Sequence, residues 1–204
     1  LCLQTNWSCL VLALFMMHTK TLLKTIGKAE VLGLDKVLEY ANNELCSGNE
    51  RGMFVTAVLG RLDLASGKLT LANAGHNPIL IRKKGVYDYV KLPKGFILGG
   101  LEGCKYKEYQ TELAPGDQVF IYTDGVTEAT NTDGEQFGED RLKNCLNAAD
   151  DKTTIGSCRA VRDAVKEFVG ETEQFDDITM LCLRYIGSGA QKLTIEADTA
   201  KLPD

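Results

Sequence analysis

Two stretches near the start of the sequence have apolar residues that repeat every three to four positions. The first covers residues 10–23 and ends at Gly27, and the second covers residues 34–45 and ends near Gly48. Residues three and four apart share one face of an α-helix, and glycine commonly follows the last helical turn. The pattern therefore predicts two helices, each with one apolar stripe that packs against other parts of the fold.

From residue 54 onward the sequence changes to short runs rich in β-branched and aromatic residues. Residues typical of turns separate these runs, which favours hairpin reversals over helical crossovers. The sheet is therefore predicted to be mostly antiparallel. The runs are FVTAVLGRLDL, KLTLANA, PILIRK, VYDYVKL, YKEYQTEL and QVFIYT, and the turns fall at residues 65–67, 77–78, 84–85, 99–100 and 115–117.

Helical periodicity returns in residues 139–148 and 155–169, and a last strand, ITMLCLRY, follows. Helices at both ends of a run of antiparallel strands predict an α+β layered fold rather than a doubly wound one. Residues 187–190 are small and read as a linker. The tail QKLTIEADTAKLPD after them has the pattern of an opening strand, so we expect a second module to begin there.

The composition is that of one folded domain. The chain has 204 residues, of which 44% are hydrophobic and 25% are charged. This predicts a single hydrophobic core and argues against a disordered or low-complexity chain. The 23 basic and 28 acidic residues give a net charge of -5. Nucleic-acid binding is not predicted, because a protein that binds a phosphate backbone needs an excess of positive charge.

Seven cysteines are scattered along the chain without a C-x-x-C pair. Their odd number and irregular spacing argue against a zinc site or a disulfide framework and predict reduced thiols in the cytoplasm. The most apolar stretch, residues 10–17, is shorter than the ~20 residues of a membrane-spanning helix, so no span is predicted. No signal-peptide pattern is present, and the start at Leu1 leads us to expect a fragment.

Two acidic corners lie where apolar strands end or begin. Asp124 follows QVFIYT, and Asp176 precedes ITMLCLRY. If these strands are antiparallel neighbours, the two carboxylates meet at one end of the sheet. Paired carboxylates repel one another unless a cation lies between them, and oxygen ligands favour Mg²⁺ or Mn²⁺. A divalent metal site is one interpretation, and two solvated turns are the other.

Several neighbours of these acids are further candidates. Gly125 would let the backbone turn sharply behind the first acid if its φ is positive. Asp177, Glu128 and Thr179 are placed to orient water on a bound metal. Asp177 is explained equally well as a turn residue at the start of the strand. His76, in a turn between strands, is predicted to be structural because a lone histidine there is more often structural than catalytic.

Five phrases give these corners a context. These phrases lie between Ala13 and Tyr185. Taken in chain order, they resemble the PPM class of metal-dependent serine/threonine protein phosphatases, in its bacterial SpoIIE-like and RsbU-like branch. The phrases are ALFM followed by a TLLK helix, GMFVTAVLGRLDLASGKLTLANAGHNP, LAPGDQVFIYTDGVTEATN, GEQFGEDRL and FDDIT.

The resemblance implies an antiparallel β-sandwich flanked by helical pairs, with a phosphatase domain over residues 1–186. It implies a cluster of acids that binds two Mn²⁺ or Mg²⁺ ions, in which Asp124 and Asp176 match two of the acids, with Gly125 and Asp177 beside them. Such a centre hydrolyses phosphoserine or phosphothreonine with a metal-bound hydroxide and no phosphoenzyme. The implied substrate is a phosphorylated anti-anti-sigma-type protein in partner-switching signalling.

The sequence departs from the family at its start. The family has further acidic ligands in an early strand and in a D-x-x-G-x-G turn, where this chain has QTNWSC, residues 4–9. With the first strands and these ligands missing, one ion or none is expected, and the alternative is a non-catalytic module that docks a partner. An open sheet edge would favour a homodimer. The tail, residues 187–204, resembles a linker and the first strand of an anti-sigma-type kinase domain.

Overall fold

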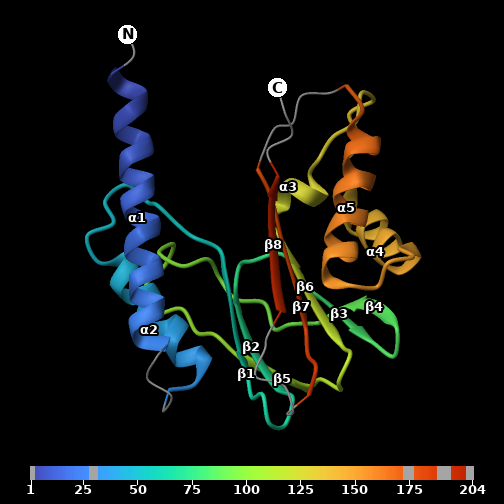
Figure 1. The fold of residues 1–204 in the computed structure, drawn as a ribbon. Helices are drawn as coiled ribbons and strands as arrows, with labels where there is room; N and C mark the ends of the chain where they lie inside the picture. The colour runs from blue at the N-terminus through green and yellow to red at the C-terminus, as the bar shows by residue number, and fades with distance from the viewer. Residues whose placement is uncertain (1–2, 28–31, 172–176, 188–193, 201–204) are drawn as a thin grey trace. The chain divides into compact units, whose positions relative to one another are not determined.

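The computed structural model describes residues 3–27, 32–171, 177–187 and 194–200 (Figure 1). The chain forms two compact units, and each contains one sheet and one pair of long helices. The first unit consists of Leu1–Leu62, Leu69–His76 and Leu92–Thr111, and the second of Asp63–Lys68, Asn77–Lys91 and Glu112–Asp204.

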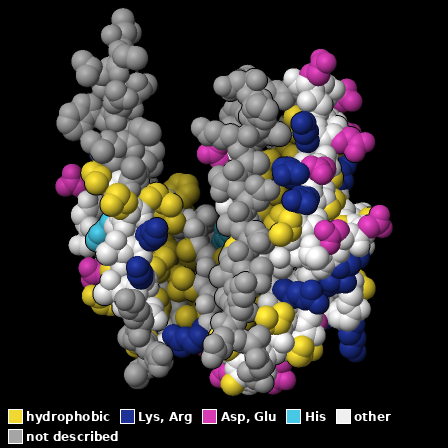
Figure 2. Space-filling model, in the orientation of Figure 1, with side chains coloured by type: hydrophobic (Ala, Val, Ile, Leu, Met, Phe, Trp, Pro, Cys, Tyr) yellow, Lys and Arg dark blue, Asp and Glu magenta, His cyan; other side chains and the backbone are white. Residues whose placement is uncertain are grey.

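The first unit has a three-stranded sheet in the order β1-β2-β5. Its elements are α1 (Leu3–Gly27), α2 (Leu34–Cys46), β1 (Ala57–Leu62), β2 (Lys68–Ala74) and β5 (Glu108–Glu112). Strands β1 and β2 are antiparallel, with Ala57 opposite Ala74. Helix α2 buries Leu34, Leu38 and Leu45 against the sheet residues and Leu98. Hydrophobic side chains remain exposed on the described part of α1 (Figure 2).

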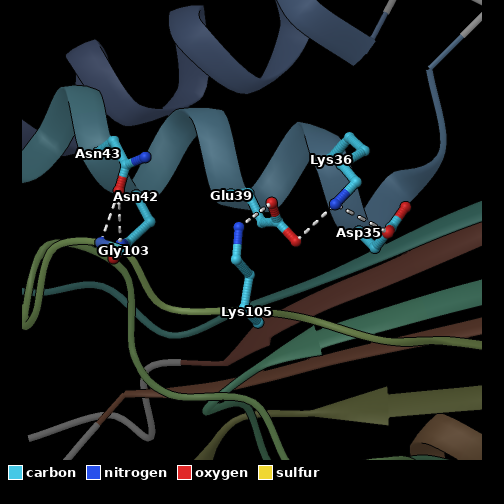
Figure 3. Close-up of polar contacts among 7 residues, drawn as sticks. All are labelled: Asp35, Lys36, Glu39, Asn42, Asn43, Gly103 and Lys105. Atoms are coloured by element: carbon cyan, nitrogen blue, oxygen red, sulfur yellow. Dashed lines mark hydrogen bonds and ion pairs between the residues drawn. The ribbon is translucent and has the colours of Figure 1, made fainter.

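Polar residues of α2 hold the loop that follows Leu98 (Figure 3). Asn42 is fully buried, donates from Nδ2 to the carbonyl of Leu101 over 2.8 Å and accepts the N–H of Gly99 over 3.0 Å. Glu39 forms an ion pair of 2.9 Å with Lys105. Hydrogen bonds from Lys105 and Lys36 hold the pKa of Glu39 below its ordinary value. Helix α2 therefore fixes the backbone of this loop.

The second unit has a five-stranded sheet in the order β4-β3-β6-β7-β8, with every neighbouring pair antiparallel. Three helices belong to this unit. Its elements are β3 (Leu80–Lys83), β4 (Val86–Tyr89), β6 (Gln118–Tyr122), α3 (Asp124–Thr127), α4 (Gly138–Ala148), α5 (Thr154–Val169), β7 (Ile178–Arg184) and β8 (Thr194–Ala200).

The core of the second unit lies between the sheet and the helices α4 and α5. Phe120 and Met180 of the sheet pack in one cluster with Leu142 of α4 and with Val161 and Val165 of α5, and all five are 1% exposed or less. The composition predicted a single core. The described residues form two core clusters, because each sheet buries its apolar face against a helix pair of its own.

The α+β fold with antiparallel sheets is confirmed, and the four long helices and the strands occur where the periodicity predicted them. Two elements differ from the expectation. Residues 124–127 form the short helix α3, and residues 194–200 of the tail form β8, which pairs with β7 in this sheet. A domain beyond the tail stays a prediction. Among the described residues, no helix is both long enough and apolar enough to cross a membrane.

Gly67, in the turn after β1, has a backbone conformation and a close neighbour that both disfavour a larger residue. Its φ is +76°, and a Cβ atom there would lie 2.3 Å from the carbonyl oxygen of Leu113. Gly67→Ala is expected to lower the free energy of unfolding by about 3 kcal/mol, from left-handed strain and steric overlap together. Gly85→Ala is the matched control. Its φ is +89° with no atom within 4 Å of the added Cβ, so strain alone costs about 1 kcal/mol.

Urea denaturation followed by circular dichroism measures both changes. Equal losses for Gly67→Ala and Gly85→Ala would show that the close approach of Leu113 has no energetic effect.

Candidate functional site

Asp124 lies where β6 passes into α3. Thr123 has extended φ and ψ angles of -89° and 161°, and the helix begins at the next residue. The carbonyl of Asp124 accepts the N–H of Glu128 over 2.8 Å, and its Oδ1 accepts the N–H of Gly125 over 3.1 Å. The residue is exposed, whereas Gly125 and Val126 after it are buried. The first turn of α3 therefore anchors the backbone and leaves the carboxylate at the surface.

The start of β7 lies directly beside this corner. Tyr122 is opposite Met180 in the antiparallel register of β6 and β7. One residue further on, the N–H of Thr123 donates to the carbonyl of Thr179 over 3.0 Å. The Thr123 hydroxyl accepts the N–H of Thr179 over 3.0 Å and donates to the carbonyl of Asp177 over 3.3 Å. The strands are thus antiparallel neighbours, and Asp177 lies at the same end of the sheet as Asp124.

The other acidic corner is only partly described. Asp177 is exposed, and Asp176 lies outside the described residues. The convergence of the Asp124 and Asp176 carboxylates therefore stays a prediction, which the pairing of the flanking segments supports. Glu128 is exposed at the end of α3.

Gly125 differs from the expectation. It lies inside α3 and is not among the glycines with a positive φ. The condition for a sharp turn behind Asp124 is therefore not met, because the chain leaves β6 through a helical turn that any residue can adopt. Gly125 is buried within this helical turn.

The donor set for a metal ion is incomplete in the described part of the chain. No group of three or more histidine, cysteine, aspartate or glutamate residues there is arranged to hold a metal. Residues 4–9 belong to the continuous helix α1, so the stretch QTNWSC forms no metal-binding turn. The carboxylates of Asp124 and Asp177 carry oxygen atoms of the kind that Mn²⁺ and Mg²⁺ prefer, and such cations need more ligands than two side chains offer.

The buried Tyr122 is unsuited to acid–base catalysis, and His76 has a structural contact in its own turn. Burial raises the pKa of Tyr122 to about 12, so its phenol stays protonated at neutral pH. His76 exchanges two hydrogen bonds with the side chain of Asn73, through its own N–H at 2.8 Å and its own carbonyl at 2.9 Å. These contacts agree with the structural role predicted for His76. The buried Asn42, which holds the loop after Leu98, was not found by sequence reasoning, because a single asparagine in a helix carries no pattern.

The Thr123 hydroxyl joins the two strands at the site. Thr123→Val keeps the shape of the side chain but leaves the N–H of Thr179 without its acceptor. We expect it to lower the free energy of unfolding by about 1–2 kcal/mol. Thr123→Ser keeps the hydroxyl and is expected to stay within about 0.5 kcal/mol of the unaltered chain. Urea denaturation measures both, and equal stabilities for the valine and serine variants would contradict the role of the hydroxyl.

One family model and two curated proteins are similar in sequence to this chain. The family model of Stage II sporulation protein E (SpoIIE) matches residues 12–186. Protein IcfG of Synechocystis sp. is 32% identical over 139 residues, which are 66% of this chain and 21% of that protein. Phosphoserine phosphatase RsbU of Bacillus subtilis is 29% identical over 100 residues, which are 48% of this chain and 30% of RsbU. The chain thus spans less than a third of the length of these curated relatives.

Solved structures show the same fold. The SiaA-PP2C domain of Pseudomonas aeruginosa has a TM-score of 0.72 and 22% identity, over 85% of this chain and 70% of that one. The catalytic domain of the serine threonine protein phosphatase PstP, in complex with two manganese ions, has a TM-score of 0.60 and 14% identity. That match covers 85% of this chain and 81% of PstP. At these identities the likeness concerns the fold alone.

Proposed function

The chain belongs to the SpoIIE family of protein serine/threonine phosphatases, and from this we propose that it takes part in metal-dependent hydrolysis of phosphoserine or phosphothreonine on a regulatory protein. The proposed substrate is a phosphorylated anti-anti-sigma-type protein in partner-switching signalling. Its support is the similarity to RsbU, a phosphoserine phosphatase.

The observation that carries the proposal is the antiparallel pairing of β6 with β7. It brings Asp124 and the segment that begins at Asp177 to one end of the sheet. Asp124 and Asp176 are the proposed ligands of Mn²⁺ or Mg²⁺, with Asp177 and Gly125 beside them. When bound, such ions supply a hydroxide for attack on phosphorus and offset the charge of the phosphate oxygens.

The residues of this chain have separate tasks in that proposal. Asp124 offers a surface carboxylate whose backbone is fixed by the first turn of α3. Thr123 ties that turn to β7 and so sets the separation of the two acidic segments. The buried Tyr122 stays neutral and adds no charge beneath the site.

A second candidate function is a non-catalytic module that keeps the phosphatase fold and docks a partner protein. Two observations favour it: the described residues hold no group of three metal ligands, and residues 4–9 are helical. A centre with few carboxylates lacks the negative charge that holds two divalent ions. A homodimer of this chain is also proposed, from the exposed apolar residues of α1.

The two functions are separated by one pair of measurements on the chain. Isothermal titration with MnCl₂ and MgCl₂ reports metal binding. Release of phosphate from p-nitrophenyl phosphate and from a phosphoserine peptide reports hydrolysis, each with and without EDTA. Binding together with EDTA-sensitive hydrolysis supports the phosphatase. Absence of both would overturn it in favour of the docking module.

A further inference from the structure

Strand β4 is an edge of the five-stranded sheet, because β3 is its one neighbouring strand in the described part of the chain. In an antiparallel pair, every second residue of an edge strand directs its N–H and C=O away from the neighbour. The N–H of Val90 donates to the carbonyl of Ile79 over 2.9 Å, so these two form a hydrogen-bonded pair. By alternation, Tyr89 and Tyr87 direct their backbone groups outward, where they are a template for another strand.

Side chains, rather than a strand, bind these outward groups. Asn147, near the end of α4, accepts the N–H of Tyr87 at Oδ1 over 2.8 Å and donates from Nδ2 to the Tyr87 carbonyl over 3.0 Å. The N–H of Tyr89 donates to Oδ1 of Asp88 over 3.0 Å. A side-chain amide offers one acceptor and two donor hydrogens, and a residue of a paired strand likewise exchanges both N–H···O bonds with its partner. The amide of Asn147 therefore takes the place of a strand at Tyr87.

Helix α4 lies along this edge, beside β4 (Figure 1). Residues four positions apart share one stripe of a helix, and three such residues of α4 contact β4: Glu139, Lys143 and Asn147. They meet the strand in reverse order. The carbonyl of Glu139 accepts the Tyr89 hydroxyl over 2.8 Å, Lys143 pairs with Asp88 over 3.4 Å, and Asn147 binds Tyr87. Exposed ion pairs stabilise little, so the two hydrogen bonds of Asn147 are the specific contact of this stripe with the backbone of β4.

The side chain of Tyr87 is held separately, inside the core. It is 1% exposed, and its hydroxyl donates to Oε1 of Gln118 and lies 3.1 Å from the hydroxyl of Ser157. Gln118 in turn donates from Nε2 to the carbonyl of Lys152 over 2.7 Å. These contacts do not involve Asn147. A change at Asn147 therefore opens the backbone edge at Tyr87 while the side chain of Tyr87 keeps β4 in the sheet.

We propose that Asn147 keeps the β4 edge closed, and that this edge, once opened, pairs with β4 of a second copy of the chain. A strand can pair antiparallel with its own copy about a two-fold axis, because each copy then presents the same surface to the other. Strand β4 suits such a pair, since Tyr87 and Tyr89 both direct their N–H and C=O outward. The surface differs from α1, through which a homodimer is proposed above. This inference is independent of phosphatase activity.

Amide hydrogen exchange of the full chain, followed by NMR, tests the proposal. Asn147→Ala removes both hydrogen bonds, so at low protein concentration the Tyr87 amide is expected to exchange at least about 100-fold faster than in the unaltered chain. The amide of Phe120, in the central strand β6, reports global unfolding and is expected to accelerate less than about tenfold. Asn147→Asp keeps an oxygen that accepts the Tyr87 N–H and is expected to stay within about tenfold of the unaltered rate. Asn144→Ala, the same substitution at an exposed position of α4, is the matched control and is expected to change nothing.

Protein concentration then tests the pairing with a second copy. In Asn147→Ala, raising the concentration is expected to slow Tyr87 exchange again by at least about tenfold, together with a dimer seen by sedimentation velocity. A dimer through α1 would leave Tyr87 exchange unchanged. Three results would overturn the proposal. In the first, Tyr87 exchanges no faster in Asn147→Ala than in Asn144→Ala. In the second, Tyr87 and Phe120 accelerate equally, which would mean a loss of overall stability. In the third, Tyr87 exchange in Asn147→Ala is fast at every concentration, which would mean that the open edge accepts no second copy.

Discussion

Replacing Asp124 with asparagine is expected to lower Mn²⁺-dependent phosphate release by more than about 100-fold. Loss of an outer partner of a metal ligand already costs about 10–100-fold, and Asp124 is proposed to bind the metal directly. Asparagine keeps the size of the side chain and an oxygen that accepts the N–H of Gly125, as Oδ1 does at 3.1 Å. It removes the negative charge that holds a divalent cation. The proposed site loses its metal affinity while the first turn of α3 keeps its geometry.

Because Asp124 is exposed, Asp124→Asn is expected to change the free energy of unfolding by less than about 0.5 kcal/mol. Lost activity would then not reflect unfolding. Asp133→Asn is the matched control, since Asp133 is an exposed acid in the following loop and is expected to keep full activity. Kinetics with p-nitrophenyl phosphate over a range of Mn²⁺ concentrations measure turnover and metal dependence separately. Unchanged kinetics in Asp124→Asn would remove Asp124 from the site.

Sequence patterning predicted the elements that have strong periodicity or clear turn residues. Helix α5 is capped by Gly170, whose φ is +63°, directly after the periodic stretch 155–169 that predicted the helix. The hairpin between β3 and β4 turns at Lys84 and Gly85, both with positive φ. Such signals are local, because they depend on backbone conformations that few residue types adopt. These signals can therefore be recognised in the sequence without knowledge of the rest of the fold.

What the sequence could not supply depends on contacts between distant segments. Helix α3 has four residues, too few for a periodic pattern. The tail was recognised as a strand, but its pairing with β7 is a long-range choice that residues 194–200 do not encode alone. At the candidate site, the sequence stated the pairing of the strands next to Asp124 and Asp176 only as a condition, and the antiparallel register of β6 and β7 meets it. The lack of family ligands at residues 4–9 was also stated from the sequence, whereas their helical conformation was not predicted.

Phe120→Ala is expected to lower the free energy of unfolding by about 3–5 kcal/mol, the range for removing a buried aromatic side chain. Phe120 is fully buried at the centre of β6, with Leu80 opposite it on β3 and Cys182 opposite it on β7. Its ring meets Tyr87 edge-on at 6.4 Å between centroids and Tyr122 at 6.5 Å. The alanine variant loses these contacts together with the apolar area that the ring buries.

Two further variants separate cavity formation from other causes. Phe120→Leu fills most of the space and is expected to cost about 1.5 kcal/mol or less. Phe54→Ala removes the same side chain from a position that is 59% exposed in the first unit, and is expected to stay within about 0.5 kcal/mol. Urea denaturation measures all three. A loss for Phe120→Ala no larger than that for Phe54→Ala would contradict a core centred on β6, on which the position of Asp124 at the end of that strand depends.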